Sequence, residues 1–99
     1  MKQEALAAKR YTVSGRVQGV GFRNFVEHVA GKIGVDGFVR NRRDGCVEVY
    51  AIGTHEQLKS LRAALEKGPL IAYVSGVSEE TDAVDNRYIG TFTIEITLE

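Results

Sequence analysis

The sequence predicts an α+β domain in which two helices pack on one face of an antiparallel sheet. Some segments alternate apolar and polar residues, as half-buried strands do, and others repeat apolar residues every three or four positions, as amphipathic helices do. They follow in the order strand, helix, strand, strand, helix, strand, with one further strand, which is typical of a ferredoxin-like sandwich. With 99 residues, the chain is expected to form a single domain.

The first strand and the first helix are predicted from the spacing of their apolar residues. Residues 11–17 alternate, with Tyr11, Val13 and Val17 on one side of the strand. After a glycine-dense turn, a helix begins near residue 22 and ends before Gly34, because glycine is common just beyond a helix C-terminus. The apolar stripe of this helix consists of Phe22, Phe25, Val26, Val29 and Ile33.

A tight hairpin is predicted in the middle of the chain. It joins strands over residues 37–41 and 46–52, because Asp44 and Gly45 between them form a strong hairpin signal. We expect these two strands to be antiparallel neighbours in the sheet. Their connecting turn is short, so residues at the end of the first strand should lie close to the start of the second.

The second helix begins at a capping signal. Thr54 and Gln57 have the spacing of a capping box, and Gly68 with Pro69 ends the helix. Its apolar stripe consists of Leu58, Leu61 and Leu65. The rest of the chain is predicted as a weaker strand, a polar loop and a clearly alternating strand, over residues 72–79, 80–90 and 92–98.

Composition and charge argue against several classes of protein. Thirteen basic and thirteen acidic residues give zero formal net charge, so no overall field attracts a nucleic acid. No apolar run approaches the roughly 20 residues that cross a bilayer. Residues 1–10 lack the apolar region of a signal peptide, and we expect them to form a loose, exposed tail before a domain over residues 11–99. The single cysteine, Cys46, has no partner for an internal disulfide, which favours the cytoplasm.

The most informative segment runs from Gly15 to Arg23, where a glycine-dense turn leads from a strand into a helix N-terminus. Such a turn can bind an anion, because its glycines let backbone N–H groups point inward and the first helical turn adds unpaired N–H groups. The Arg23 guanidinium can add a planar fork of donors. A plain turn with a solvated arginine explains the same residues. Nucleotide-binding loops are disfavoured, because position 24 is asparagine and no Gly-Lys-Ser/Thr follows.

A second segment, from Gly37 to Glu48, places Asn41 at the end of a strand just before the hairpin turn. Asparagine there is usually a turn former, but its amide can also hold a water, because it carries both an acceptor and donors. The residues alone leave both possibilities open. His28 and His55 lie far from any other ligand type, so we expect no metal.

Together these two segments resemble the acylphosphatase family. Gly15–Arg23 matches the family pattern G-x-V-Q-G-V-x-(F/Y)-R in full, and Gly37–Glu48 matches G-(F/Y/W)-V-x-N-x-x-D-G-x-V-E in full. The resemblance implies a hydrolase that cleaves the carboxyl-phosphate anhydride of acyl phosphates. It names Arg23 as the side chain that binds phosphate and Asn41 as the residue that orients the attacking water. It assigns the phosphate cradle to the backbone of Gln18, Gly19, Val20, Gly21, Phe22 and Arg23.

The resemblance also carries expectations about partners. We expect catalysis without a metal or a cofactor, a small acyl phosphate as substrate, inorganic phosphate as product and competitive inhibitor, and a monomer that binds neither nucleic acid nor membrane. One alternative is an RNA-binding module, since ferredoxin-like sheets bind RNA through exposed aromatics, here Phe38 and Tyr50. A second alternative is a regulatory domain that binds an acyl phosphate or carbamoyl phosphate without hydrolysing it. Turnover separates these classes of function.

Overall fold

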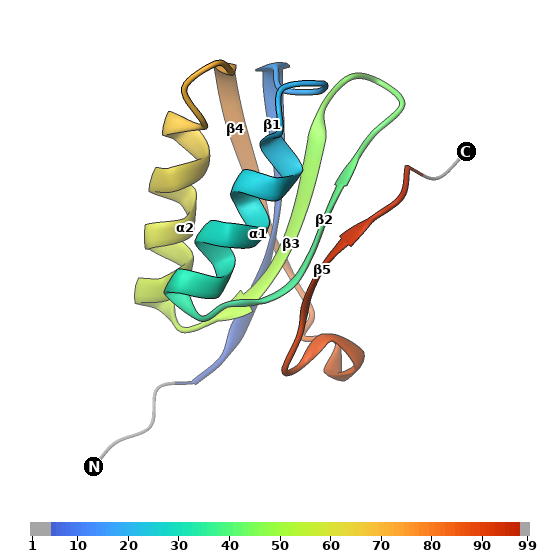
Figure 1. Cartoon of the computed structure of the whole chain (residues 1–99). Helices are drawn as coiled ribbons and strands as arrows, with labels where there is room; N and C mark the ends of the chain where they lie inside the picture. Colours follow the sequence, from blue (N-terminus) through green and yellow to red (C-terminus); the bar gives the residue numbers. More distant parts are fainter. Residues whose placement is uncertain (1–4, 98–99) are drawn as a thin grey trace.

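Two helices lie against one face of a five-stranded sheet (Figure 1). The computed structural model describes residues 5–97. The elements in chain order are β1 (Ala7–Arg16), α1 (Phe22–Ile33), β2 (Asp36–Asn41), β3 (Val47–Gly53), α2 (His55–Lys67), β4 (Tyr73–Asp82), the short 3-10 helix η1 (Asn86–Tyr88) and β5 (Phe92–Glu95). The strand order across the sheet is β4-β1-β3-β2-β5. The predicted class, a ferredoxin-like α+β sandwich, is confirmed.

The sheet is mixed, whereas the sequence predicted a wholly antiparallel one. The pairs β1–β4, β1–β3 and β2–β3 are antiparallel, but β5 runs parallel to β2. Alternation in the sequence reveals that a segment is a strand, but it does not reveal the direction of its neighbour. The strand β5 is also shorter than predicted: its pairing with β2 ends at Glu95 and Arg40. Leu98, the last residue of the predicted strand, lies outside the described residues.

The prediction of a loose tail over residues 1–10 is wrong from Ala7 onward, because β1 begins there. Ala8 is buried, and Arg10 is held by an ion pair with Asp82 at 2.9 Å. Strand β4 is longer than predicted for the same reason, since Ala8 provides a pairing partner for Asp82. Part of the predicted polar loop therefore belongs to β4, and η1 lies within the rest.

Local signals place both helices as predicted. Helix α1 ends at Gly34, whose N–H donates to the carbonyl of Ala30 at 2.8 Å. At the start of α2, the Gln57 N–H donates to Thr54 Oγ1 and the Thr54 N–H donates to Gln57 Oε1, so the capping box is formed. The end of α1 and the start of α2 each depend on residues a few positions apart, so the sequence alone is enough to predict them.

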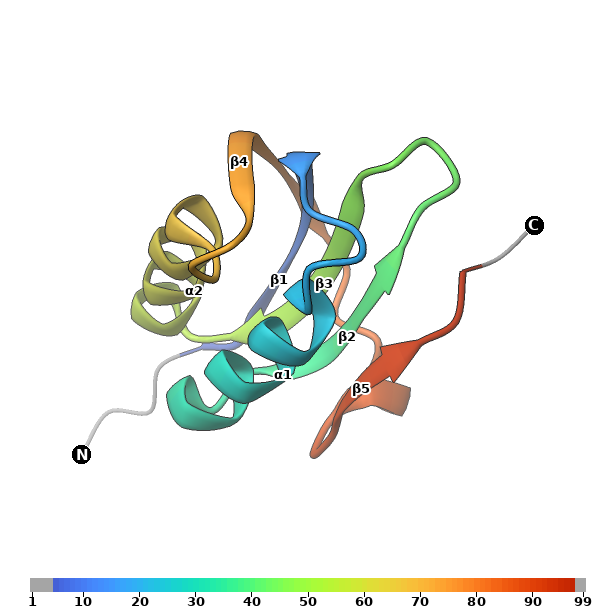
Figure 2. The ribbon, with the colours of Figure 1, turned by 45° about the horizontal axis from the view of Figure 1, so that its top comes forward.

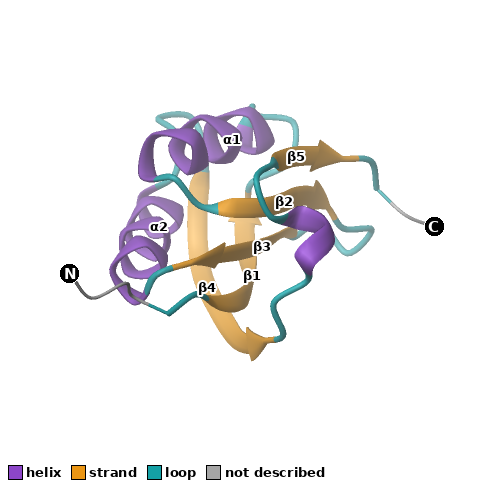
Figure 3. Ribbon diagram, turned by 90° about the horizontal axis from the view of Figure 1, so that it is seen from below, coloured by secondary structure: helices purple, strands orange, loops and turns teal. Residues whose placement is uncertain are grey.

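The main core lies between the helices and the sheet, with the two helices on the same side of the strands (Figure 3). A smaller cluster covers the other face, where Phe38 and Tyr50 stack with ring centroids 5.5 Å apart and the Tyr88 ring lies 5.1 Å from Phe38. Phe38 is only 6% exposed and Tyr50 only 2%. These two rings are therefore not available to stack on RNA bases, which removes the observation behind the RNA-binding alternative.

Candidate active site

The β1–α1 loop and the β2–β3 hairpin lie side by side at one end of the sheet (Figure 2). A cavity of about 260 Å³ opens there, between this loop, the start of α1, the end of β2 and strand β5. Arg23 and Asn41 both line it, although they come from the two separate sequence segments. The full lining is Val17, Gly19, Gly21, Phe22, Arg23, Asn24, Asn41 and Ile94.

Two glycines give the β1–α1 loop its shape. Gly19 and Gly21 have φ angles of 75° and 76°, in the left-handed region that side chains other than glycine rarely adopt. Gly21 also directly precedes α1, and no side chain caps this helix. The first turn of α1 contains no acidic residue either. The N–H groups at the start of α1 are therefore left to an external acceptor, and the dipole of the helix favours an anion there.

Arg23 is half-buried, and its side chain makes no hydrogen bond or ion pair with any residue in the range 5–97. Five other arginines of that range are paired with carboxylates: Arg10, Arg40, Arg42, Arg62 and Arg87. The guanidinium of Arg23 is thus a cation in the wall of the cavity, and no carboxylate of the described chain neutralises it. A planar guanidinium of this kind matches the oxygens of a phosphate.

Asn41 is the last residue of β2 and is half-buried, and its backbone pairs with that of Val47. Its side-chain amide forms no hydrogen bond within the described chain. The turn itself is stabilised by Asp44, whose carboxylate accepts the Cys46 N–H at 3.0 Å. This argues against Asn41 as a simple turn former, and its amide remains able to accept and donate hydrogen bonds in the cavity.

Two of the predicted cradle residues do not line the cavity. Val20 packs against the main core instead. The side chain of Gln18 is directed to the hairpin, where its Nε2 donates to two backbone carbonyls. Conversely, Asn24 and Ile94 line the cavity without having been predicted. In the sequence, the asparagine is only a departure from a nucleotide-binding pattern, and Ile94 is only part of an alternating strand.

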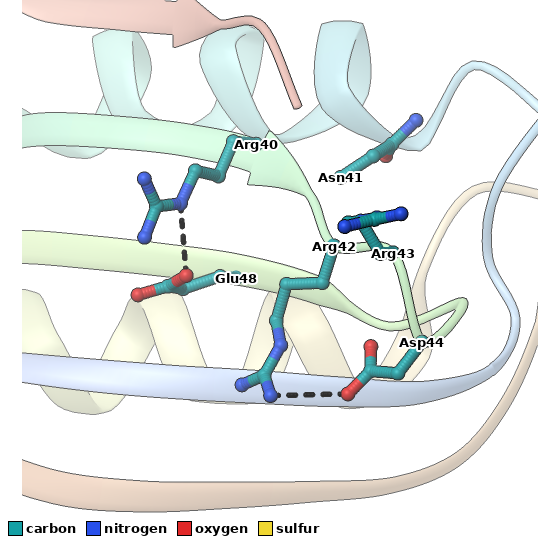
Figure 4. Close-up of a pocket in the computed structure, with 6 residues that line it drawn as sticks. All are labelled: Arg40, Asn41, Arg42, Arg43, Asp44 and Glu48. Carbon is teal, nitrogen blue, oxygen red and sulfur yellow. Dashed lines mark hydrogen bonds and ion pairs between the residues drawn. The ribbon is translucent and has the colours of Figure 1, made fainter. Parts of the chain in front are cut away.

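Asn41 also lines a larger and more open hollow, of about 480 Å³ (Figure 4). Its lining is Arg40, Asn41, Arg42, Arg43, Asp44 and Glu48. Within it, Arg40 is paired with Glu48 at 2.9 Å and Arg42 with Asp44 at 3.0 Å. The charges of Arg40 and Arg42 are balanced by these carboxylates, whereas that of Arg23 is not. The smaller cavity also includes the glycine loop and the start of α1, so it is the better site for an anion.

The carboxylate of Glu48 is deeply buried, with only 7% of its side chain exposed. Burial acts to raise the pKa of Glu48, but hydrogen bonds from Arg40 and Arg10 outweigh it and hold the pKa below its usual value. Glu48 stays ionised and joins β3 to the two strands beside it. Its role is to hold together the sheet that carries Asn41.

The described residues contain no group of three His, Cys, Asp or Glu side chains that could hold a metal ion. His28 and His55 are exposed, as predicted for surface residues. No helix among residues 5–97 is long and apolar enough to cross a membrane.

Comparison with known proteins identifies the family. A family model described as Acylphosphatase matches residues 9–94. An acylphosphatase from Koribacter versatilis is 49% identical over 93% of this chain and 83% of its own length. The crystal structure of an acylphosphatase from Bacillus subtilis, 37% identical, covers 92% of this chain and 99% of its own with a TM-score of 0.84. An acylphosphatase structure from Coxiella burnetii, 34% identical, covers 96% of this chain and 100% of its own with a TM-score of 0.87. The chain therefore belongs to the acylphosphatase family.

Proposed function

We propose that the cavity lined by Arg23 and Asn41 hydrolyses acyl phosphates to a carboxylate and inorganic phosphate. Hydrolysis of acyl phosphates follows from the family to which the chain belongs, and the roles of the residues are our proposal. One observation carries it: Arg23 and Asn41 meet in one cavity, and neither side chain has a hydrogen-bonding partner among residues 5–97. Each is thus available to a ligand.

The phosphoryl group occupies the β1–α1 loop in this proposal. Backbone N–H groups of the segment from Gln18 to Arg23 surround its oxygens, and the Arg23 guanidinium donates two further hydrogen bonds. The positive φ angles of Gly19 and Gly21 and the uncapped start of α1 support this arrangement. Phosphoryl transfer through a loose transition state needs mainly positioning and stabilisation of the equatorial oxygens, which these donors supply.

Asn41 orients the attacking water. Its side-chain oxygen accepts a hydrogen bond from the water, and the water oxygen then attacks phosphorus. The bond between phosphorus and the acyl oxygen breaks, the carboxylate leaves with the bonding electron pair, and a proton of the water passes to a phosphate oxygen. Because attack and departure are in line, the acyl group leaves on the side of phosphorus away from Asn41.

This reaction needs no proton donor in the cavity. The leaving carboxylate has a conjugate acid with a pKa of about 4, so it departs unprotonated. Accordingly, none of the described residues that line the cavity has an acidic or imidazole side chain. We propose that catalysis proceeds without a metal or a cofactor, with the charge of the phosphoryl group balanced by Arg23 and backbone dipoles.

Inorganic phosphate should compete with the substrate, because the loop recognises the phosphoryl group, which both share. We further propose that the protein acts as a monomer in the cytoplasm, since the whole cavity is built from one chain and Cys46 is a free cysteine.

Hydrolysis of benzoyl phosphate in the presence of excess chelator tests this function. We expect turnover to continue at its full rate. Complete loss that a divalent ion restores would contradict a metal-free site. Binding of benzoyl phosphate without turnover would instead indicate a regulatory domain that recognises acyl phosphates.

A further inference from the structure

The side chain of Gln18 joins the two segments that form the proposed site. Its Nε2 donates to the carbonyl oxygen of Arg42 at 2.7 Å and to that of Cys46 at 2.9 Å. A primary amide has two N–H bonds, and here both are directed to the β2–β3 hairpin. Gln18 itself lies in the β1–α1 loop, so one side chain links this loop to both ends of the hairpin turn.

The carbonyls that accept these bonds belong to a well-connected turn. The Arg42 N–H donates to the Cys46 carbonyl at 2.8 Å, and the Gly45 N–H donates to the Arg42 carbonyl at 3.2 Å. The carboxylate of Asp44 also accepts a hydrogen bond from the Cys46 N–H. The turn is therefore held together by its own hydrogen bonds. Since Arg42 directly follows Asn41, the position of this turn relative to the β1–α1 loop bears on the position of Asn41.

The backbone pairing of β1 with β3 ends at Val13 and Val47 on this side of the sheet. Beyond it, Ser14 Oγ lies 3.6 Å from Cys46 Sγ, and the two Gln18 bonds connect the β1–α1 loop itself with the hairpin. The amide of Gln18 therefore helps to determine the relative position of the loop and the hairpin.

We propose that Gln18 is a positioning residue whose side chain holds Asn41 at a fixed distance from the bound phosphoryl group. This inference rests on the proposed function of Asn41. The two carbonyl oxygens need two N–H donors, and the glutamine side chain is long enough to supply both from one amide. A glutamate would place a charged acceptor against both carbonyls, and a methionine of similar length would offer no donor.

The test is the variant Gln18→Met, studied by steady-state hydrolysis of benzoyl phosphate and by calorimetric binding of inorganic phosphate. We expect kcat to fall by about ten- to a hundredfold, as displacement of a reacting group by about 1 Å can do. The phosphate Kd should change by less than about threefold, because the backbone donors and Arg23 are untouched. A loss of phosphate affinity that matches the loss of kcat would overturn the proposal.

Gln57→Met provides a matched control. Gln57, in the first turn of α2, also bridges two elements through its amide, which donates to the Ile33 carbonyl at 3.2 Å. The start of α2 lies at the opposite end of the sheet from the β1–α1 loop (Figure 1). This variant should lower the melting temperature and leave kcat unchanged. If both variants lost kcat equally, the effect of Gln18→Met would reflect general stability and not positioning.

The double variant Gln18→Met, Asn41→Ala separates this inference from the proposed function. If Gln18 acts through Asn41, adding Gln18→Met to Asn41→Ala should lower kcat by less than about twofold. A full additional loss would overturn the positioning role. If Asn41→Ala alone keeps a normal kcat, the proposed function of Asn41 fails, whatever Gln18 does. Gln18→Glu gives a second single variant, and failure of both variants to fold would also overturn the proposal, since Gln18 would then be required for the fold.

Discussion

Replacing Arg23 with alanine removes the one cavity cation that the described chain leaves without a counter-charge. No carboxylate in that part of the chain is paired with Arg23, so the substitution leaves no buried anion behind. We therefore expect the fold to be retained, with a free energy of unfolding within about 0.5 kcal/mol of wild type. The loss should appear in anion binding and in catalysis.

The magnitude follows from the number and the setting of the lost bonds. A guanidinium offers a phosphate two parallel charge-assisted hydrogen bonds. Because Arg23 is half-buried and not fully enclosed, we take the lower end of the range, about 1.5 kcal/mol for each bond. The sum of about 3 kcal/mol corresponds to roughly a hundredfold weaker phosphate binding. The fall in kcat/KM should be larger still, about a thousandfold, because charge on the equatorial oxygens is stabilised more strongly in the transition state.

Calorimetric titration with inorganic phosphate and steady-state hydrolysis of benzoyl phosphate measure the two effects on the same preparation. Arg23→Lys should recover less than a tenth of the lost kcat/KM, because an ammonium cannot form two parallel bonds. Arg16→Ala is the control, since Arg16 is an exposed arginine that precedes the loop and does not line the cavity. If Arg23→Ala binds phosphate as tightly as wild type, the assignment of the cavity as the phosphate site is wrong.

Three further predictions concern inhibition, acid stability and the loop. Inorganic phosphate should raise the KM for benzoyl phosphate and leave kcat unchanged, and a purely non-competitive pattern would count against a shared site. Although burial acts to raise the pKa of Glu48, its bonds to Arg40 and Arg10 lower it, so its stabilisation is present above about pH 4.5 and lost as pH falls through the lowered pKa. Glu48→Gln should therefore lower the free energy of unfolding, measured with urea, by about 2 to 3 kcal/mol at pH 7 and by less at pH 3. An equal loss of stability at both pH values would refute the ion-pair argument. Gly21→Ala should destabilise the protein by about 1 kcal/mol, because φ is 76° there, and weaken phosphate binding; unchanged Kd and stability would contradict the role given to the loop.

Elements defined by short-range signals could be predicted from the sequence. The capping box of Thr54 and Gln57, the hairpin signal of Asp44 and Gly45, and the end of α1 at Gly34 each depend on residues a few positions apart. The structure has each of them where the sequence predicted it. Such signals specify the local backbone with little help from the rest of the chain.

The errors concern interactions between distant residues. Residues 7–10 resembled a tail because Lys9 and Arg10 are charged, but their charges are paired with Glu79, Asp82 and Glu48 on neighbouring strands. A single sequence does not show that such partners will face one another. The parallel direction of β5 could not be predicted either, because it depends on the path of the chain from β4 at one edge of the sheet to β5 at the other.

The site shows the same division. The two motifs predicted that Arg23 and Asn41 carry the chemistry, and the structure places both side chains in the wall of one cavity. The role of the Gln18 side chain could not be predicted, since its two acceptors are backbone carbonyls of Arg42 and Cys46, and nothing in the identity of those residues marks their carbonyls as acceptors. Backbone carbonyls that accept such hydrogen bonds can be identified only once the fold is known.

The central claim is that one cavity separates binding of the anion from orientation of the water. The most direct test is to measure kcat for benzoyl phosphate and Kd for inorganic phosphate on Asn41→Ala, once circular dichroism has shown that the variant is folded. The account predicts a fall in kcat on the order of a hundredfold or more, with a phosphate Kd close to that of wild type, because every proposed phosphate donor remains in place. A near-normal kcat would contradict it, and another group would then have to orient the water.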